Sequence, residues 1–245
     1  MNLVINSEYN RLGDWIKEIP VFFSTKGEVI YKGRNELKIF NTEFGKVVVK
    51  SFKVPHIINR FAYSFLRFSK AKRSYSYSIE ILKRDFKTPQ PIAYIEIFNK
   101  GFLFESYYIS DYIDYMSMKS FNYTKKLTEE DVEILKAFAR FTAQLHEKEI
   151  YHKDYSNGNI LYKKEGEIIS FYLVDVNRIK FKKVTEKMAY KAFHRLYLSI
   201  EMLEIIAREY ALQRQMDVEK SIDRVKKLNF KTMRPEKSFH LPEPD

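Results

Sequence analysis

The sequence contains no cysteine, which excludes disulfides, thiolate metal sites and cysteine nucleophiles. It also lacks any apolar run near the roughly 18 residues that a membrane-spanning helix needs. The first residues, MNLVINSEYNRLGDW, do not show the basic and then apolar order of a secretory signal. Glycine is scarce, and no G-x-G-x-x-G motif is present. We therefore expect a soluble, cytoplasmic protein from a reducing compartment.

Positive charge and aromatic residues are what the sequence has in abundance. The formal net charge is +11, and aromatic residues make up 16% of the 245 positions. A chain of this length can bury a sizeable core, as one large domain or as two lobes. The charge favours a polyanionic partner, which could be nucleic acid, an anionic membrane face or a phosphorylated substrate. Because no aromatic RNA-binding signature is found, no specific nucleic acid is expected; the oligomeric state stays open.

Secondary-structure patterns differ between the two halves of the chain. The first half favours strands, interrupted by one helical segment, and the second half favours helices, interrupted by two short strands. The predicted strands cover 28–53, 88–113, 159–164 and 168–176, and the predicted helices cover 56–86, 128–147 and 185–212. This order predicts an α+β protein with two lobes, an N-terminal lobe over 1–112 and a C-terminal lobe over 113–245.

Three polar residues in the second half have a spacing that suits phosphoryl transfer. Asp154 and Asn159 lie in the segment IYHKDYSNGNILY, and Asp175 ends the apolar run FYLV. A predicted hairpin would carry Asn159 and Asp175 on neighbouring strand ends. A carboxylate and a side-chain amide are oxygen ligands that suit Mg²⁺, and a carboxylate can orient or deprotonate an incoming hydroxyl. We therefore interpret Asn159 and Asp175 as metal ligands and Asp154 as the residue facing the acceptor.

The same segments resemble known kinase motifs. HKDYSNGN resembles the catalytic loop of protein-kinase-like enzymes, and LVDVN is similar to their metal-binding strand and aspartate. VVVK resembles the strand that carries the nucleotide lysine, which implies this role for Lys50. The helix that follows offers Glu80 as the partner of Lys50. The resemblance spans about residues 28 to 210 and implies a bilobal protein-kinase-like fold.

Within that superfamily the chain resembles the lipopolysaccharide core kinases, the Kdo and heptose kinase family of Gram-negative bacteria. The resemblance is carried by KAKRSYSYSIEILKRDFKTPQPIAYIE, LHEKEIYHKDYSNGNILY and VDVNRIKF. It implies a kinase that uses ATP and Mg²⁺ to phosphorylate a sugar hydroxyl of a lipid A-linked core oligosaccharide. The Gly-rich loop is missing, so phosphate contact in YKGRNELK would depend on Gly33 and Arg34. Asp175 is followed by Val-Asn rather than Phe-Gly, and no A-P-E motif follows, which argues against an ordinary protein kinase.

Other functions stay open at this level. The acceptor could belong to a RIO-like protein kinase or to an aminoglycoside-type phosphotransferase, and the missing glycines leave room for a pseudokinase or nucleotide-binding scaffold. Each residue also has a structural explanation: Asp154 as a turn former, Lys50 as a solvated strand end, and His146 as a core histidine. His152 is expected to support the catalytic loop.

One basic and aromatic stretch, NRFAYSFLRFSKAKRSY, suggests a location. Its cations are Arg60, Arg67, Lys70, Lys72 and Arg73. A basic residue near an anionic leaflet contributes on the order of 1 kcal/mol, so this cluster could hold the protein peripherally at the inner face of the inner membrane, where a lipid-linked acceptor lies. The same cations could instead bind phosphate groups of the acceptor, or nucleic acid.

Overall fold

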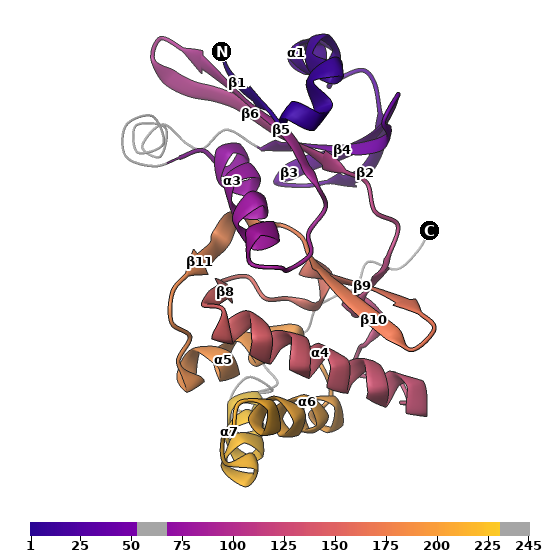
Figure 1. The fold of residues 1–245 in the computed structure, drawn as a ribbon, viewed down its shortest axis with the longest axis vertical. Coiled ribbons are helices and arrows are strands. Elements are labelled where there is room, and N and C mark those ends of the chain that lie inside the picture. The colour runs from indigo at the N-terminus through magenta and orange to yellow at the C-terminus, as the bar shows by residue number, and fades with distance from the viewer. Residues whose placement is uncertain (53–67, 231–245) are drawn as a thin grey trace, which may run out of the picture. The chain divides into compact units, whose positions relative to one another are not determined.

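A computed structural model describes residues 1–52 and 68–230 (Figure 1). The chain divides into two compact units, one made of Met1–Ser117 and Asn159–Lys180 and the other of Met118–Gly158 and Phe181–Asp245. The predicted lobe boundary after residue 112 stays a prediction. Residues 159–180 follow the predicted catalytic loop in sequence and group with the first unit.

A six-stranded antiparallel sheet forms the centre of the first unit, with the strand order β1-β5-β6-β4-β3-β2. Its strands are β1 Asn2–Ile5, β2 Glu28–Lys32, β3 Asn35–Thr42, β4 Gly45–Phe52, β5 Pro91–Asn99 and β6 Phe102–Asp111. Gly45 and Gly101 have φ values of 98° and 80°, which only glycine adopts readily, so they form the tight turns before β4 and β6. The predicted strands over 28–53 and 88–113 are confirmed, whereas β1 was not predicted.

The two faces of β4 have different neighbours because side chains alternate along a strand. Val47 and Val49 are fully buried on one face, in a core shared with helix α1, Gly13–Phe22. Phe52 lies on the opposite face, in a cluster with Ala71 and Tyr75 of helix α3, Lys70–Lys83, which runs beside the sheet in Figure 1. Lys50 has the same parity as Phe52 and therefore belongs to the α3 face.

A short hairpin completes the first unit. Strands β9, Ile160–Glu165, and β10, Ile168–Leu173, pair antiparallel around Gly166, and β7, Met116–Ser117, pairs with β9. The end of β10 is tied to the segment after α3, because the Leu173 amide donates to the Lys87 carbonyl over 2.9 Å. The Thr88 hydroxyl donates to the Leu173 carbonyl over 2.7 Å. The two predicted strands at 159–164 and 168–176 are thus confirmed.

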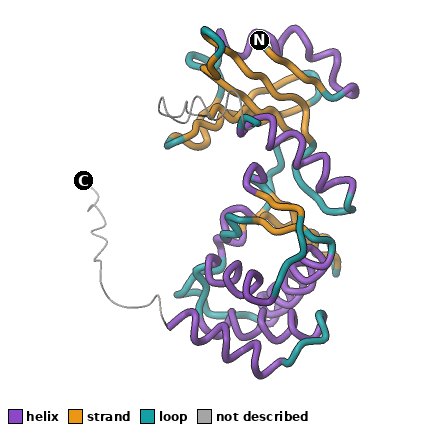
Figure 2. The backbone as a smooth tube through the Cα atoms, turned by 90° about the vertical axis from the view of Figure 1, so that its left-hand side faces the viewer, coloured by secondary structure: helices purple, strands orange, loops and turns teal. Residues whose placement is uncertain are grey.

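Helices dominate the second unit (Figure 2). They are α4 Glu129–Glu147, α5 Glu186–Phe193, α6 Ile200–Gln213 and α7 Val218–Phe230, with the short strands β8 Ile150–His152 and β11 Ile179–Phe181 nearby in the sequence. The 3-10 turns of the described residues are η1 Ser7–Leu12, η2 Met118–Ser120, η3 Asn157–Asn159, η4 Val176–Arg178 and η5 His194–Leu196. A capping box begins α4 at the predicted helix start, since Thr128 and Asp131 satisfy each other's backbone amides.

The single helix predicted over 185–212 is wrong. Tyr197 adopts φ 52°, a left-handed conformation that ends the helical path after α5 and η5. The Ser199 side chain then accepts a hydrogen bond from the Met202 amide and starts α6. The apolar spacing continues across the break, which is why periodicity alone joined α5 and α6. Helices α1 and α7 were not predicted either.

Part of the basic stretch lies outside the described residues, namely Arg60, Arg67 and the start of the helix predicted over 56–86. Its described part begins at Phe68 and continues into α3. Across 1–52 and 68–230, no helix combines the length and apolar character needed to span a membrane.

His146 lies in the core of the second unit. Its side chain is 2% exposed, and its Nδ1 is 2.9 Å from the Tyr210 hydroxyl. It is thus a core histidine, although its Nε2 is buried without a hydrogen-bond partner. Burial, and then the nearby charge of Arg214, lower the pKa of His146 from 6.5 to about 3.

This buried histidine predicts a pH dependence of folding stability. The unfolded state binds a proton below pH 6.5 and the folded state does not until about pH 3, so the free energy of unfolding should fall as pH falls through this window. The loss is about 1.4 kcal/mol per pH unit. Urea unfolding between pH 6.5 and 4 should show a shallower pH slope for His146→Gln than for the wild type. Measurements at about pH 8 separate the cost of the substitution itself, and equal slopes would contradict the assignment.

Candidate active site

The core of the candidate site is an ion pair between Lys50 and Asp175. The Lys50 ammonium donates to Asp175 Oδ1 over 2.5 Å, and the two side chains are 12% and 31% exposed. Strand β4 supplies the lysine on the face toward α3, and the turn after β10 supplies the aspartate. A charge-assisted hydrogen bond at this degree of burial is stronger than a surface pair, because solvent screens it less.

Asp175 is held in an unusual backbone conformation. Its φ is 54°, in the left-handed region, which aspartate tolerates better than branched residues do. The Asn177 side-chain amide, on the buried side of η4, donates to the same Oδ1 that Lys50 contacts. Two donors on one oxygen orient the carboxylate, and strain of this kind is typical of functional sites.

Asn159 lies at the end of the hairpin from which the chain continues to Asp175. Asn159 immediately precedes β9 and its carbonyl accepts a hydrogen bond from the Val174 amide over 3.0 Å. The neighbouring pair, Leu173 and Ile160, is the last register pair of the two strands. The hairpin therefore brings Asn159 and Asp175 to the same end, as the sequence predicted. Their role as metal ligands stays a prediction.

Asp154 lies in the second unit, in the turn after β8. The Asp154 amide donates to Nδ1 of the buried His152 over 3.2 Å, which confirms that this histidine supports the loop. The Ser156 amide closes the turn by donating to the Asp154 carbonyl over 2.9 Å. Arg195 Nη1 donates to Asp154 Oδ1 over 3.3 Å, between side chains that are 36% and 34% exposed.

The predicted pair between Lys50 and Glu80 is not formed. Glu80 instead accepts a hydrogen bond from Arg84 Nε, one turn further along α3, over 2.8 Å. The buried residues of α3 are Ala71, Ser74, Tyr75, Ser78 and Ile81, so its buried positions carry no acid and Glu80 lies just beside them. Lys50 takes the carboxylate of Asp175 as its partner.

Gly33 and Arg34 lie in the exposed turn between β2 and β3. The Tyr31 side chain packs against Gly33 so closely that an added Cβ would come within 2.6 Å of its hydroxyl oxygen. Because Tyr31 is 54% exposed, its ring could move aside, so this contact alone does not require glycine at position 33. Arg34 is close enough to Lys70 of α3 to influence its charge state.

Sequence reasoning missed three residues at or near these groups: Asn177, Lys70 and Arg195. Asn177 stands two positions after Asp175, and its type, an amide beside a candidate metal ligand, was the available signal. Lys70 was assigned to a general basic patch. Arg195 had no sequence signal, because its proximity to Asp154 arises from the turn η5 after α5.

The residues fit the Mg²⁺ that a kinase fold implies. Asp175 and Asn159 present one carboxylate and one amide, both hard oxygen donors. Among the described residues no cluster of three or more His, Cys, Asp or Glu could hold a metal alone. A donor set this small suits a Mg²⁺ that arrives with the phosphates of a nucleotide, which supply further oxygens.

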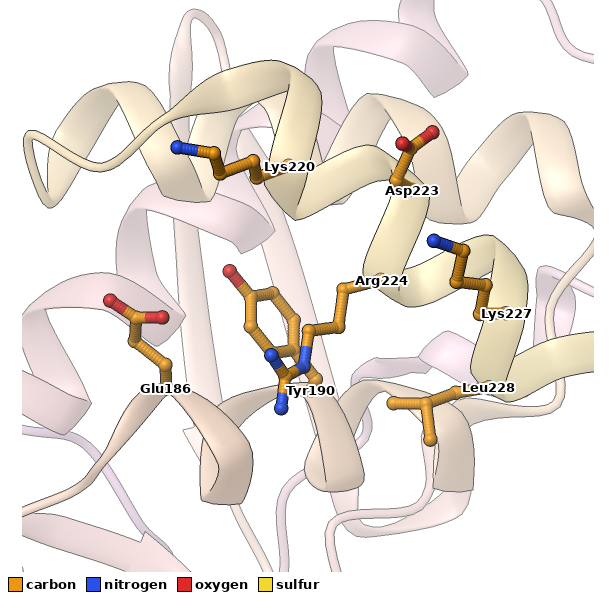
Figure 3. Close-up of a pocket in the computed structure, with 7 residues that line it drawn as sticks. All are labelled: Glu186, Tyr190, Lys220, Asp223, Arg224, Lys227 and Leu228. Atoms are coloured by element: carbon orange, nitrogen blue, oxygen red, sulfur yellow. The ribbon is translucent and has the colours of Figure 1, made fainter.

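A separate pocket of about 480 Å³ lies between α5 and α7 (Figure 3). Its lining carries both charges, with Glu186 and Asp223 beside Lys220, Arg224 and Lys227. Lys220 pairs with Asp217 over 3.0 Å. Mixed charges of this kind balance each other locally and do not select a phosphate chain.

Comparisons with known proteins identify the family and the fold of this chain. The family model for the lipopolysaccharide kinase (Kdo/WaaP) family matches residues 32–227. A search of curated protein sequences gives no match.

Many solved structures are similar to this chain, and three of them illustrate the range. WaaP in complex with acyl carrier protein has a TM-score of 0.66 at 14% identity, with 94% of this chain and 99% of that chain covered. The Rio2 kinase from Chaetomium thermophilum, solved with ADP, Mg²⁺ and phosphoaspartate, has a TM-score of 0.48 at 15% identity over 92% of this chain and 70% of that chain. A double mutant of the PknI kinase domain of Mycobacterium tuberculosis has a TM-score of 0.45 at 12% identity, over 82% and 94% respectively.

The family match covers most of the chain, including the strand of Lys50, the loop of Asp154 and the turn of Asp175. The WaaP likeness covers nearly all of both chains, so it extends to the whole fold. The chain therefore belongs to the lipopolysaccharide kinase (Kdo/WaaP) family and is a phosphotransferase with a protein-kinase-like fold.

Proposed function

We propose that the protein phosphorylates a hydroxyl group of a Kdo or heptose residue in the inner core of lipopolysaccharide, with ATP as donor and Mg²⁺ as cofactor. The observation that carries this proposal is the grouping of Lys50, Asp175 and Asn159 at one end of the β9–β10 hairpin. A cation for phosphate oxygens and two oxygen ligands for a metal are what transfer from a nucleotide requires.

Each residue has a role in this mechanism. Lys50 binds the phosphate chain of ATP, and Asn159 and Asp175 hold Mg²⁺. Bound Mg²⁺ neutralises negative charge on the phosphates. Asn177 keeps the Asp175 carboxylate in its orientation through the hydrogen bond to Oδ1. Gly33 and Arg34 contribute backbone and side-chain donors to the same phosphates.

Asp154 acts on the acceptor. Its carboxylate takes the proton of the sugar hydroxyl while the sugar oxygen forms a bond to the γ-phosphorus and the bond from that phosphorus to the β-γ bridging oxygen breaks, which releases ADP. Arg195 donates to one oxygen of this carboxylate and so helps to orient it toward the acceptor. The hydrogen bond from the Asp154 amide to His152 fixes the loop, which keeps the Asp154 carboxylate in position to act as a base.

The location follows from the acceptor. A lipid-linked oligosaccharide under assembly lies at the cytoplasmic face of the inner membrane, and we propose that the protein works there in peripheral contact. Lys72, in the first turn of α3, supplies a cation for that contact, and Phe68, just before the helix, supplies a 61% exposed aromatic ring.

Mass spectrometry of core lipopolysaccharide, from cells with and without the gene, tests the proposal directly. We expect one phosphate fewer on the core, about 80 Da by mass of HPO₃, when the gene is absent. A gene copy encoding Asp154→Asn should fail to restore it, whereas a wild-type copy should succeed. An unchanged core would contradict the proposal, and phosphate transfer by the purified enzyme to protein rather than to lipid A-linked sugar would favour the RIO-like alternative.

A further inference from the structure

The basic stretch before and within α3 separates into two groups in the structure. The Lys72 ammonium lies 4.1 Å from the ring centroid of the exposed Phe68. The Lys70 ammonium, two residues earlier, lies 5.8 Å from the ring centroid of the buried Phe52 in strand β4. Lys70 therefore lies toward the sheet, whereas Lys72, in the same helical turn, lies beside an exposed ring.

Lys70 shares the Phe52 ring with the candidate nucleotide lysine. The Lys50 ammonium lies 5.2 Å from the same ring centroid. An aromatic ring stabilises a cation near its face, so Phe52 interacts with both ammonium groups, in addition to the Asp175 carboxylate that pairs with Lys50. The shared ring, together with the electrostatic influence of both Lys50 and Asp175 on Lys70, places Lys70 at the edge of the group formed by Lys50 and Asp175.

The charges around Lys70 are mostly positive. Burial lowers the pKa of Lys70, and the neighbouring cations Arg34, Lys50 and Arg73 lower it further, while Asp175 acts in the opposite direction. Together with Lys70, these cations come from three separate segments: the β2–β3 turn, β4 and α3. Bringing these positive charges together costs free energy, because they repel one another. An anionic ligand bound among them would offset this repulsion.

The buried face of α3 provides no carboxylate to balance these cations. The buried serines of this helix are already engaged, since Ser74 Oγ donates to the Lys70 carbonyl over 3.0 Å and Ser78 lies 3.0 Å from the Tyr108 hydroxyl. Glu80 is paired with Arg84. Within the described part of the chain, Asp175 is thus the only carboxylate among the charged groups that act on Lys70. A ligand with several negative charges would complete the cluster.

We propose that Lys70 is a second phosphate-binding lysine of the nucleotide site and contacts the phosphate chain of ATP from the α3 side while Lys50 contacts it from β4. This inference rests on the proposed function, because that function supplies the nucleotide. It also explains how phosphates are held without a Gly-rich loop: side-chain cations on β4 and α3 replace part of the backbone amides that such a loop would provide.

Nucleotide binding by calorimetry tests the proposal with ATP, ADP and adenosine as probes in the presence of Mg²⁺. Lys70→Met should weaken ATP binding about 10-fold, because one charge-assisted contact to phosphate is lost, and should leave adenosine binding unchanged. Lys70→Arg should keep most of the ATP affinity. Lys72→Met, two residues away on the same turn, is the matched control and should bind ATP in membrane-free solution as the wild type does.

Other outcomes separate this inference from the proposed function. If Lys50→Met weakens ATP binding and Lys70→Met does not, the role of Lys70 is wrong while the nucleotide site stands. If Lys70→Met raises the KM for the sugar acceptor and leaves the Kd for ATP unchanged, the lysine serves an acceptor phosphate and the proposal is overturned. If the wild type binds no ATP, the proposed function itself fails.

Discussion

Replacing Asp175 by alanine is expected to reduce turnover at least about 10³-fold and to remove the Mg²⁺-dependent part of ATP binding. The carboxylate is the one charged metal ligand that we assign, and the two hydrogen bonds to its Oδ1, from Lys50 and Asn177, fix its orientation. Single-turnover assays and calorimetry with and without Mg²⁺ measure the two effects separately.

The same substitution should not weaken the binding of ATP in the absence of Mg²⁺. Asp175 is the carboxylate that offsets the cations near Lys50 and Lys70, so its removal leaves a more positive site. We expect metal-free ATP to bind as tightly as to the wild type or more tightly. Asp14→Ala removes an exposed carboxylate from α1 and serves as the control, with unchanged turnover. Full activity of Asp175→Ala would disprove the metal assignment.

Replacing Asp154 by asparagine is expected to lower kcat by about 10²–10⁴, the range that general-base assistance supplies. The amide keeps the size of the side chain but cannot take the proton of the acceptor hydroxyl. ATP affinity should stay at the wild-type value, because nucleotide contacts are assigned to Lys50, Asp175 and their neighbours. Steady-state kinetics with a lipid A-linked core acceptor, together with ATP titrations, distinguish this variant from Asp175→Ala.

The contact between Arg195 and Asp154 gives a second test of the role assigned to Asp154. If the contact of 3.3 Å serves to orient the carboxylate, Arg195→Met should lower kcat more than it changes KM, and Arg195→Lys should restore part of the loss. In the Asp154→Asn background, Arg195→Met should have little further effect, since the oriented carboxylate is already gone. Independent, multiplicative losses would show that Arg195 acts elsewhere, and wild-type turnover by Asp154→Asn would exclude a catalytic role for that loop.

Local patterns were sufficient for several elements. The helix that begins after Thr128, the β9–β10 hairpin and the strands around Gly45 and Gly101 depend on residues close in sequence, and the structure confirms them. Local patterns were insufficient where a backbone dihedral interrupts a continuing apolar period. Tyr197 is the example, since nothing in its residue type demands φ 52°.

In the candidate site, too, some features could be predicted from the sequence and others could not. Residue types and spacing led to the prediction of Asp154, Asn159 and Asp175, because a metal ligand or a base must be a particular chemical group. The resemblance to kinase motifs added Lys50. Partners could not be predicted, because they depend on which side chains meet across elements. Glu80 was chosen for its position on a helix, yet the rotation of α3 directs serines toward the sheet and leaves Glu80 with Arg84.

By itself the sequence determined the family, the α+β class and the order of the chemical groups along the chain, since these depend on residue type and short-range spacing. The tertiary structure decided that Lys50 pairs with Asp175, that Asn177 holds the same oxygen, and that Lys70 leaves the surface patch to join them. The physical reason is that strand alternation and helix rotation set which face a side chain occupies. Its partner on that face comes from a segment far away in the sequence, such as the turn that follows β10.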